Sequence, residues 1–313
     1  MHLNKVMSKF YKKIIHLIIF TSVLFLLLFV PTKTLAFAQN GLAIWYQSML
    51  PALLPMMIVT SCMIKLNVTT LFSSFLYPFT KRLYHISQNG TYALLIGFLC
   101  GFPMGAKVIC ELYQYKRLSK EEANLLLPIC NNIGPIFLIT YGLKPLVNNH
   151  LYFILLLFYA IPLVYAYFLF KKKHFTHKPI TPSKSPAFSI ALDEAISEGA
   201  MSILSLGGYL MFFSILTLIP MSLLKIPDTF SVFLTCLLEI TNGLSYKVAL
   251  PPYIYLSLIQ FGGICCIFQT LKYISKTDLS FKKYLLHKII LTLITLMVFY
   301  FVDVFSYGVF FAV

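Results

Sequence analysis

Acidic residues are scarce in this sequence, and charged residues of either sign are few. Of 313 residues, 10 are Asp or Glu and 25 are Lys or Arg, so 11% are charged while 59% are hydrophobic. The mean hydropathy is +0.82. A water-soluble domain of this length with so little charge would not stay dispersed. The composition therefore predicts an all-α polytopic membrane protein whose surroundings are the lipid bilayer.

The sequence also lacks the motifs of common enzyme and metal sites. It contains no HExxH, GxSxG, Walker or GxGxxG motif, and its seven cysteines include no CxxC pair. We therefore expect no enzymatic activity, no metal site and no cofactor. The net charge of +15 fits lysine-rich cytoplasmic loops better than nucleic-acid binding. An intramembrane enzyme acting on a lipid-linked precursor stays open as an alternative, because such a site can be built from Asn, Glu and Lys alone.

Apolar runs long enough to cross a bilayer recur along the chain. Crossing takes about 20 apolar residues in a helix. The runs of this length are 42–64, 123–143, 151–170, 203–224, 248–271 and 285–304. Lysines precede a further run at 14–30, which predicts an uncleaved signal anchor, with a cleaved signal peptide as the alternative. When the run at 14–30 is included, the sequence predicts seven to eight transmembrane helices.

Two more segments, 91–115 and 229–247, are apolar but interrupted. If the N-terminus is cytoplasmic and both segments return to the side they entered from, 20 Lys and Arg lie inside and three outside. The inside group includes Lys288. A full crossing by either segment would move a lysine cluster outside. The count thus predicts two re-entrant or broken hairpins in two halves of opposite orientation, a plan that many secondary transporters share. Residues 190–203 predict an amphipathic helix lying at the membrane interface.

The sequence GFPMGAK at 101–107 breaks the first interrupted segment. The residues from 91 to 101 reach about 16 Å as a helix, half a bilayer, so the break would lie near the midplane. A half-helix starting after it would aim its free N–H groups and Lys107 at a polar or anionic ligand. The candidate substrate-binding residues are Gly101, Phe102, Pro103, Gly105 and Lys107. The alternative is a proline-kinked helix in which Lys107 reaches to the interface.

Polar residues also interrupt the span at 123–143. In LLLPICNNIGPIFL, residues 125–138, two prolines bracket Asn131 and Asn132. This pattern predicts a broken helix whose two amides bind a ligand. An amide pair that holds helices together is the equally weighted alternative.

A carboxylate interrupts the second apolar segment. In LLEITNG, residues 237–243, Glu239 follows an apolar run and is followed by Thr241 and Asn242 in a turn-forming sequence. A carboxylate within a membrane is by default a functional hypothesis. We expect Glu239 to titrate, to bind a coupling cation or to neutralise Lys107, with Thr241 and Asn242 beside it. The pair Gly262–Gly263 indicates a close helix contact.

Together these motifs resemble the YlbJ-type sporulation integral membrane proteins, bacterial members of the nucleoside-recognition or gate domain group. The resemblance covers residues 42–303 and rests on GFPMGAK, CNNIGP and LLEITNG in combination. It implies a multi-pass inner-membrane protein of spore-forming bacteria that is associated with spore cortex formation. The chain departs from the family pattern at Cys265 and Ile267, where many members carry Ser and His.

These observations predict a transporter or permease, with a non-transporting scaffold of the spore envelope as the alternative. The predicted parts are a signal-anchor span with an external loop (1–40), a first gate-like repeat (41–170), a cytoplasmic basic linker (171–189) and a second gate-like repeat (190–313). We expect a cytoplasmic N-terminus, a forespore or mother-cell membrane, a small polar or anionic substrate, a coupling cation and a homo-oligomer.

Overall fold

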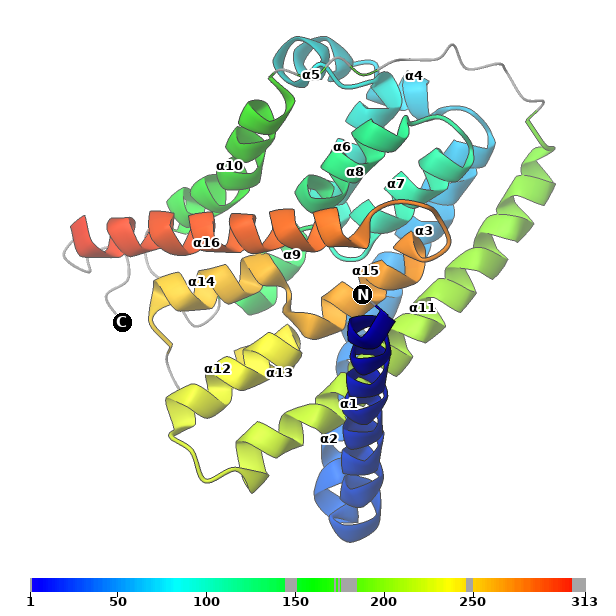
Figure 1. Cartoon of the computed structure of the whole chain (residues 1–313). Coiled ribbons are helices and arrows are strands. Elements are labelled where there is room, and N and C mark those ends of the chain that lie inside the picture. Colours follow the sequence, from blue (N-terminus) through cyan, green and yellow to red (C-terminus); the bar gives the residue numbers. More distant parts are fainter. Residues whose placement is uncertain are drawn as a thin grey trace.

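A computed structural model describes residues 2–143, 151–171, 173, 175, 185–245 and 250–305, and all regular secondary structure in these residues is helical (Figure 1). The first half contains α1 (His2–Phe29), α2 (Pro31–Ile44), η1 (Trp45–Met49), α3 (Leu50–Lys65), α4 (Thr69–Ser73), α5 (Tyr77–Tyr84), α6 (Gln88–Cys100), α7 (Met104–Gln114), α8 (Lys120–Cys130), α9 (Pro135–Phe137), η2 (Leu138–Gly142) and α10 (Leu151–Phe170). The second contains α11 (Phe188–Leu218), η4 (Ile219–Leu223), α12 (Asp228–Leu238), α13 (Ile240–Leu244), α14 (Pro252–Phe261), α15 (Gly263–Ile274) and α16 (Phe281–Phe305). The predicted linker 171–189 lies mostly outside the described residues.

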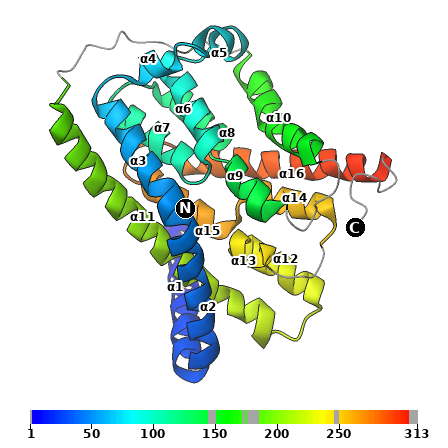
Figure 2. The ribbon, with the colours of Figure 1, turned by 180° about the vertical axis from the view of Figure 1, so that it is seen from behind.

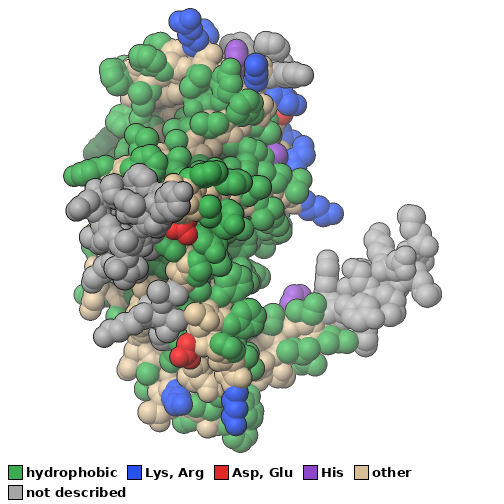
Figure 3. Space-filling view, turned by 90° about the vertical axis from the view of Figure 1, so that its left-hand side faces the viewer, with side chains coloured by type: hydrophobic (Ala, Val, Ile, Leu, Met, Phe, Trp, Pro, Cys, Tyr) green, Lys and Arg blue, Asp and Glu red, His purple; other side chains and the backbone are tan. Residues whose placement is uncertain are grey.

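Six helical stretches of the described chain are long and apolar enough to cross a membrane. They are Pro31–Lys65, Lys120–Thr140, Tyr152–Phe170, Phe188–Leu223, Pro252–Ile274 and Phe281–Phe305. Shorter apolar helices lie at Lys13–Phe29 and Asp228–Leu238. The all-α, multi-pass architecture expected from the composition is confirmed. In Figure 3, hydrophobic side chains cover most of the face shown, and Lys and Arg side chains gather toward its upper and lower ends.

The region predicted as an external loop after the first span is helical. Helix α1 ends at Phe29 and α2 starts at Pro31, where a proline fits because the first helical N–H has no partner to lose. The two helices form a hairpin that projects from the rest of the protein (Figures 1 and 2). Helix α2 then runs through a π-helical turn into α3, and it packs closely on α11, where Gly41 lies against Ser214.

The predicted interfacial helix at 190–203 is also different in the structure. It is the first half of α11, which continues without a break to Leu218. Ala191 and Ala195 are buried against the body of the protein. Two acidic residues of the predicted polar face, Glu194 and Glu198, both pair with Lys65 of α3. The acidic residues of this face thus have an ionic partner 129 residues away in the chain, which the sequence pattern alone does not show.

Both interrupted segments fold as hairpins. The start of α6 and the end of α7 line the same cavity, so the chain turns back at Gly101–Pro103. Helix α13 is a short returning arm that packs on α12, with Gly243 against Cys236. Each hairpin is followed by a broken helix, α8–α9 after the first and α14–α15 after the second.

Helix α3 runs antiparallel to α11, and α10 contacts α16. Lys65 at the end of α3 meets Glu194 near the start of α11, with 2.7 Å between Nζ and Oε2. Tyr165 near the end of α10 meets His287 near the start of α16, with 2.6 Å between the hydroxyl and Nδ1. Each half of the chain is thus made of a long helix, a hairpin, a broken helix and a further long helix.

Candidate functional site

The tip of the first hairpin fits against the break in α8–α9. Gly101 has a φ of 75°, a conformation that residues with a Cβ rarely adopt. A Cβ at this position would lie 2.1 Å from the backbone nitrogen of Gly134. Glycine is therefore needed at 101 both for the turn and for the close approach of the two broken segments.

The tip of the second hairpin is built around a carboxylate. Glu239 ends α12 and caps α13, where its side chain accepts hydrogen bonds from the backbone N–H of Thr241 at 3.2 Å and of Asn242 at 2.7 Å. The hydroxyl of Thr241 donates to the same carboxylate. These bonds satisfy the free N–H groups at the start of α13 and fix the orientation of the Glu239 side chain at the hairpin tip.

All four helix breaks face one cavity of 590 Å³, which we call the central cavity. Phe102 contributes from the first hairpin, Gly134 from α8–α9, Glu239 from the second hairpin and Gly262 from α14–α15. Helices α3 and α11 supply further apolar walls. A helix that is interrupted inside an apolar protein leaves backbone polar groups unpaired. Such breaks are tolerated where they are buried in protein or line a cavity, as these four do.

The central cavity has the size and lining of a small-molecule site. Its volume falls within the range of about 300–1,000 Å³ that is usual for such sites. Its walls are mainly apolar, with a few polar side chains: Ser48, Thr140, Glu239, Thr241 and Gln269. Among the described residues, no Lys or Arg lies within ion-pair distance of Glu239. The carboxylate is therefore available to a ligand that carries hydrogen-bond donors or a positive charge.

The structure brings only some of the predicted site residues to this cavity. Phe102, Glu239 and Thr241 line it. Pro103 precedes α7 and is buried, and Gly105 packs so closely on α8 that a Cβ would lie 2.1 Å from the carbonyl oxygen of Cys130.

Asn242 lies behind the second hairpin and not in the central cavity. Its Nδ2 donates to Thr217 at 3.3 Å, and its Oδ1 accepts from Asn40 at 3.1 Å. The side chain thus ties the hairpin to α11 and α2.

Asn131 and Asn132 lie at the predicted break, between α8 and α9, but their side chains bond within the protein. Asn131 Nδ2 donates to Thr270 at 2.6 Å and to Tyr284 at 3.0 Å. Asn132 Oδ1 accepts from Gln260 Nε2 at 2.9 Å. These contacts match the predicted alternative in which the amides hold helices together.

Lys288 completes this network, and sequence reasoning missed it. It was counted with the cytoplasmic loop lysines, but its side chain on α16 is fully buried. The ammonium donates to the carbonyl of Asn131 at 2.7 Å and to Asn132 Oδ1 at 3.1 Å, and it lies 4.6 Å from the ring centroid of Phe102. The sequence did contain a sign that Lys288 is buried, because it lies inside the apolar run from 285 to 304, with leucines before it and isoleucines after it.

Lys107 does not point at the central cavity and does not pair with Glu239. Its ammonium lies 2.9 Å from Glu111 on the next turn of α7 and donates to Ser61 of α3. Ser61 also contacts Glu111, at 3.0 Å. The prediction that Lys107 meets a midplane ligand assumed the wrong direction for this side chain, because a helical partner four residues on is closer than the hairpin tip.

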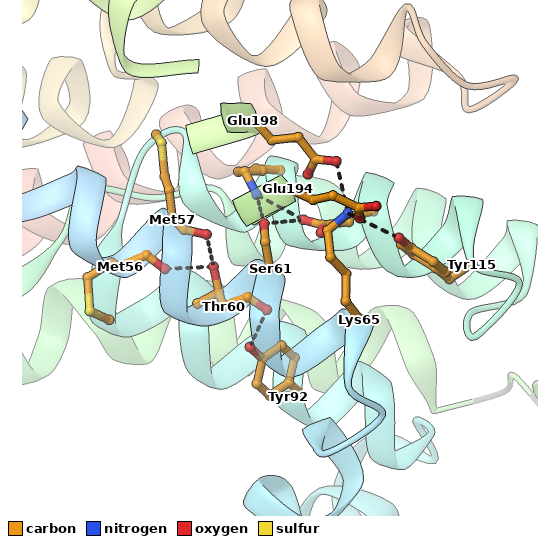
Figure 4. A network of polar contacts seen from close by, with 11 residues as sticks. Met56, Met57, Thr60, Ser61, Lys65, Tyr92, Tyr115, Glu194 and Glu198 are labelled. Atoms are coloured by element: carbon orange, nitrogen blue, oxygen red, sulfur yellow. Dashed lines mark hydrogen bonds and ion pairs between the residues drawn. The ribbon is translucent and has the colours of Figure 1, made fainter. Parts of the chain in front are cut away.

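A second ion cluster lies beside this one (Figure 4). Lys65 sits between Glu194 and Glu198 of α11, at 2.7 and 3.0 Å, with Tyr115 at 3.5 Å. Figure 4 shows Ser61 and Lys65 on the same side of α3, one turn apart. These contacts fasten α3 to α7 and α11 and leave the central cavity to Glu239. Within the described residues, no three His, Cys, Asp or Glu side chains are grouped closely enough to hold a metal ion.

Comparisons with known proteins find one informative similarity. No protein-family model and no solved structure matches the chain. The chain is similar to the sporulation integral membrane protein YlbJ of Bacillus subtilis (strain 168), with 26% identity over 274 residues. The match covers 80% of this chain, and the chain spans 64% of that protein's length.

Proposed function

From the confirmed resemblance to the YlbJ-type sporulation integral membrane proteins, we propose that this multi-pass membrane protein is a permease for a small polar solute during sporulation. The solute would occupy the central cavity. The proposal places the protein in the inner membrane of the forespore or mother cell, with its N-terminus in the cytoplasm. The gate-type kinship to nucleoside-recognition domains is part of the proposal.

The observation that carries the proposal is the meeting of four helix breaks around one buried carboxylate. Broken helices that meet at a cavity between two oppositely oriented units are the usual setting of a substrate site in secondary transporters. Glu239 is 1% exposed and has no cationic partner among the described residues. A buried carboxylate that is unpaired and faces a cavity is costly to keep unless it binds something.

The chemistry of the cavity indicates what kind of solute it takes. Glu239 accepts hydrogen bonds, and Gln269 and Thr241 offer both donors and acceptors. Apolar side chains such as Met56 and Leu210 cover the rest of the wall. We therefore propose a solute with hydroxyl, amino or amide groups on a partly apolar frame, or such a solute together with a coupling cation at Glu239.

Lys288 has a supporting part in this proposal. Its ammonium occupies the place that a bound cation would take at the break in α8, between a backbone carbonyl and an amide oxygen. It also stands over Phe102, which lines the central cavity. A shift of α16 would therefore move the Lys288 side chain relative to Phe102 in the cavity wall.

A scaffold of the spore envelope is the second candidate, and one observation favours it. Asn131 and Asn132 make most of their side-chain hydrogen bonds to other helices of the protein. If all the buried polar residues serve packing in this way, no solute needs to cross.

The test is complementation in a spore-forming host whose own relative has been deleted. Wild type, Glu239→Gln and Glu121→Gln are compared for spore formation and for the amount of membrane-inserted protein. Glu121 is an exposed carboxylate paired with Lys173, so its substitution controls for the loss of one negative charge.

Under the permease proposal, Glu239→Gln inserts at the wild-type level yet forms spores no better than the deletion strain, while Glu121→Gln is normal. If Glu239→Gln supports sporulation fully, the permease site is refuted and the scaffold is favoured. A fall in inserted protein that parallels the loss of spores also favours the scaffold.

A further inference from the structure

A separate cavity of 860 Å³ lies where the first hairpin begins and ends, and we call it the loop cavity. It is enclosed by the start of α6, the segment between α7 and α8, the start of α8 and the loop between α15 and α16. None of the residues that line it also lines the central cavity. Whatever it binds is therefore independent of the proposed permease site.

Basic side chains outnumber acidic ones around the loop cavity. Lys116, Arg117, Lys120 and Lys276 line it, against Glu122 and Asp278. Both acids are already engaged. Asp278 lies 2.6 Å from Lys120 and accepts from the hydroxyl of Tyr113 at 2.6 Å, while Glu122 accepts from the backbone N–H of Ser87 at 2.6 Å.

Asp278 remains ionised in this arrangement. The hydrogen bond from Lys120, followed by the one from Tyr113, holds the pKa of Asp278 below its ordinary value. Its charge therefore offsets that of Lys120. Among the described residues, none of the other three cations has a carboxylate within ion-pair distance.

Arg117 is the most informative of these cations. It is 8% exposed, yet its Nη1 is buried without any hydrogen-bond acceptor in the protein. A buried guanidinium nitrogen without an acceptor costs free energy, and such groups normally have a partner. Arg117 also lines the loop cavity, so a ligand bound there lies beside this guanidinium.

Two helix starts add to the positive potential. Ser87 caps α6 and Ser119 caps α8, and both serines line the loop cavity. The partial positive charge at the start of each helix favours an anion nearby, and at α8 part of it is offset by Glu121 and Glu122 of the first turn. The two helices have 13 and 11 residues, long enough for this effect.

We infer that the loop cavity binds a phosphate-bearing ligand, with Arg117 as its principal contact and Lys116 and Lys276 at its rim. Three cations without a carboxylate partner and two helix starts suit a group with more than one negative charge, and Arg117 is held in place 5.3 Å from the ring centroid of Tyr115. The guanidinium fork matches phosphate oxygens in geometry and binds them through paired hydrogen bonds. The phosphate belongs either to a soluble compound or to the headgroup of an anionic lipid, since both offer the same chemistry.

The experiment uses the full chain purified in a neutral detergent. Its thermal unfolding is followed as inorganic phosphate is added, with chloride at matched ionic strength as the reference, because a ligand of the folded state raises the unfolding midpoint. In parallel, the protein is reconstituted in vesicles of phosphatidylcholine with or without phosphatidylglycerol, re-extracted, and assayed for retained phosphatidylglycerol.

The variants are Arg117→Gln and Lys276→Gln, with Arg82→Gln as the matched control. The sequence has two arginines, and Arg82 is exposed on α5, outside the residues that line the loop cavity. Lys276 is exposed at the rim, so its substitution tests the site even if Arg117→Gln fails to fold.

If the inference is right, Arg117→Gln weakens binding by about tenfold or more, the usual scale for losing a charge-assisted contact. Lys276→Gln weakens it less, and Arg82→Gln leaves it unchanged. A phosphate-dependent shift in detergent identifies a soluble source, and retention of phosphatidylglycerol without that shift identifies a lipid source. Absence of both, or an equal loss in Arg82→Gln, would overturn the inference.

Discussion

At the residue scale, two buried ionisable side chains, Glu239 and Lys288, have different surroundings. Glu239 is stabilised by N–H groups of its own hairpin and still faces the central cavity. Lys288 is stabilised by acceptors on another helix and spans the gap where α8 is interrupted. We therefore expect substitution of Glu239 to change activity and substitution of Lys288 to change stability.

Lys288→Met tests the structural half of this division. The variant keeps the length of the side chain but leaves the carbonyl of Asn131 without its donor in a buried position. An unsatisfied buried acceptor costs on the order of 2 kcal/mol. We predict a lower thermal unfolding midpoint for the detergent-solubilised variant. Lys283→Met, on an exposed position of the same helix, should unfold like the wild type. Equal midpoints for the three proteins would show that Lys288 has no such role.

At the scale of elements, the breaks depend on glycines that allow close contact between segments. Gly101 combines a φ of 75° with contact to Gly134, and Gly262 combines a φ of 83° with contact to Phe102. A Cβ at Gly262 would lie 2.7 Å from the Phe102 ring. Each of these two contacts therefore requires a residue without a Cβ.

Gly101→Ala should prevent the first hairpin from docking. The methyl group would collide with the backbone of Gly134, which cannot move aside as a flexible side chain would. We predict a large fall in folded, membrane-inserted protein, measured by quantitative immunoblotting and size-exclusion profile. Gly208→Ala is the control, because no atom lies within 4 Å of the added Cβ on α11. Alanine is favoured over glycine in helices by about 1 kcal/mol, so this control should be neutral or slightly more stable. A normal profile for Gly101→Ala would contradict the observed tip geometry.

Sequence reasoning located the breaks that proline or a charged residue marks. Gly-Phe-Pro at 101–103, the bracketed asparagines and Glu239 all interrupt apolar runs visibly, and the structure has a break at each. The break at Gly262–Gly263 was interpreted as a close helix contact, because a glycine pair occurs both at helix breaks and where two helices pack closely.

The sequence was a poor guide where the position of a side chain depends on a residue far away in the chain. The acidic face of 190–203 was assigned to the membrane surface because Lys65, which pairs with two of its acids, is far away in the sequence. Lys288 was assigned to a loop because its acceptors lie far away in the sequence, in the break between α8 and α9. Lys107 contacts one distant partner, Ser61 on α3, and one local partner, Glu111 on the next turn of α7.

For the whole molecule, the four helix breaks line one cavity, and basic residues of the loops line another. The loop cavity and the central cavity are thereby separated, one beside loops and one among helix breaks. This division allows a ligand at the loops and a solute in the centre to be bound independently. A permease of this design requires that water-soluble molecules reach the central cavity during its cycle.

Thiol labelling tests that claim most directly. Thr241→Cys and Thr235→Cys are placed on the second hairpin of a protein in which Cys100 and Cys266 are replaced by Ala, because both line the central cavity. Thr241 lines the cavity, whereas Thr235 is fully buried outside it. In membranes treated with a membrane-impermeant maleimide, we predict labelling of Thr241→Cys and not of Thr235→Cys. Protection of both cysteines, or equal labelling of both, would contradict the claim.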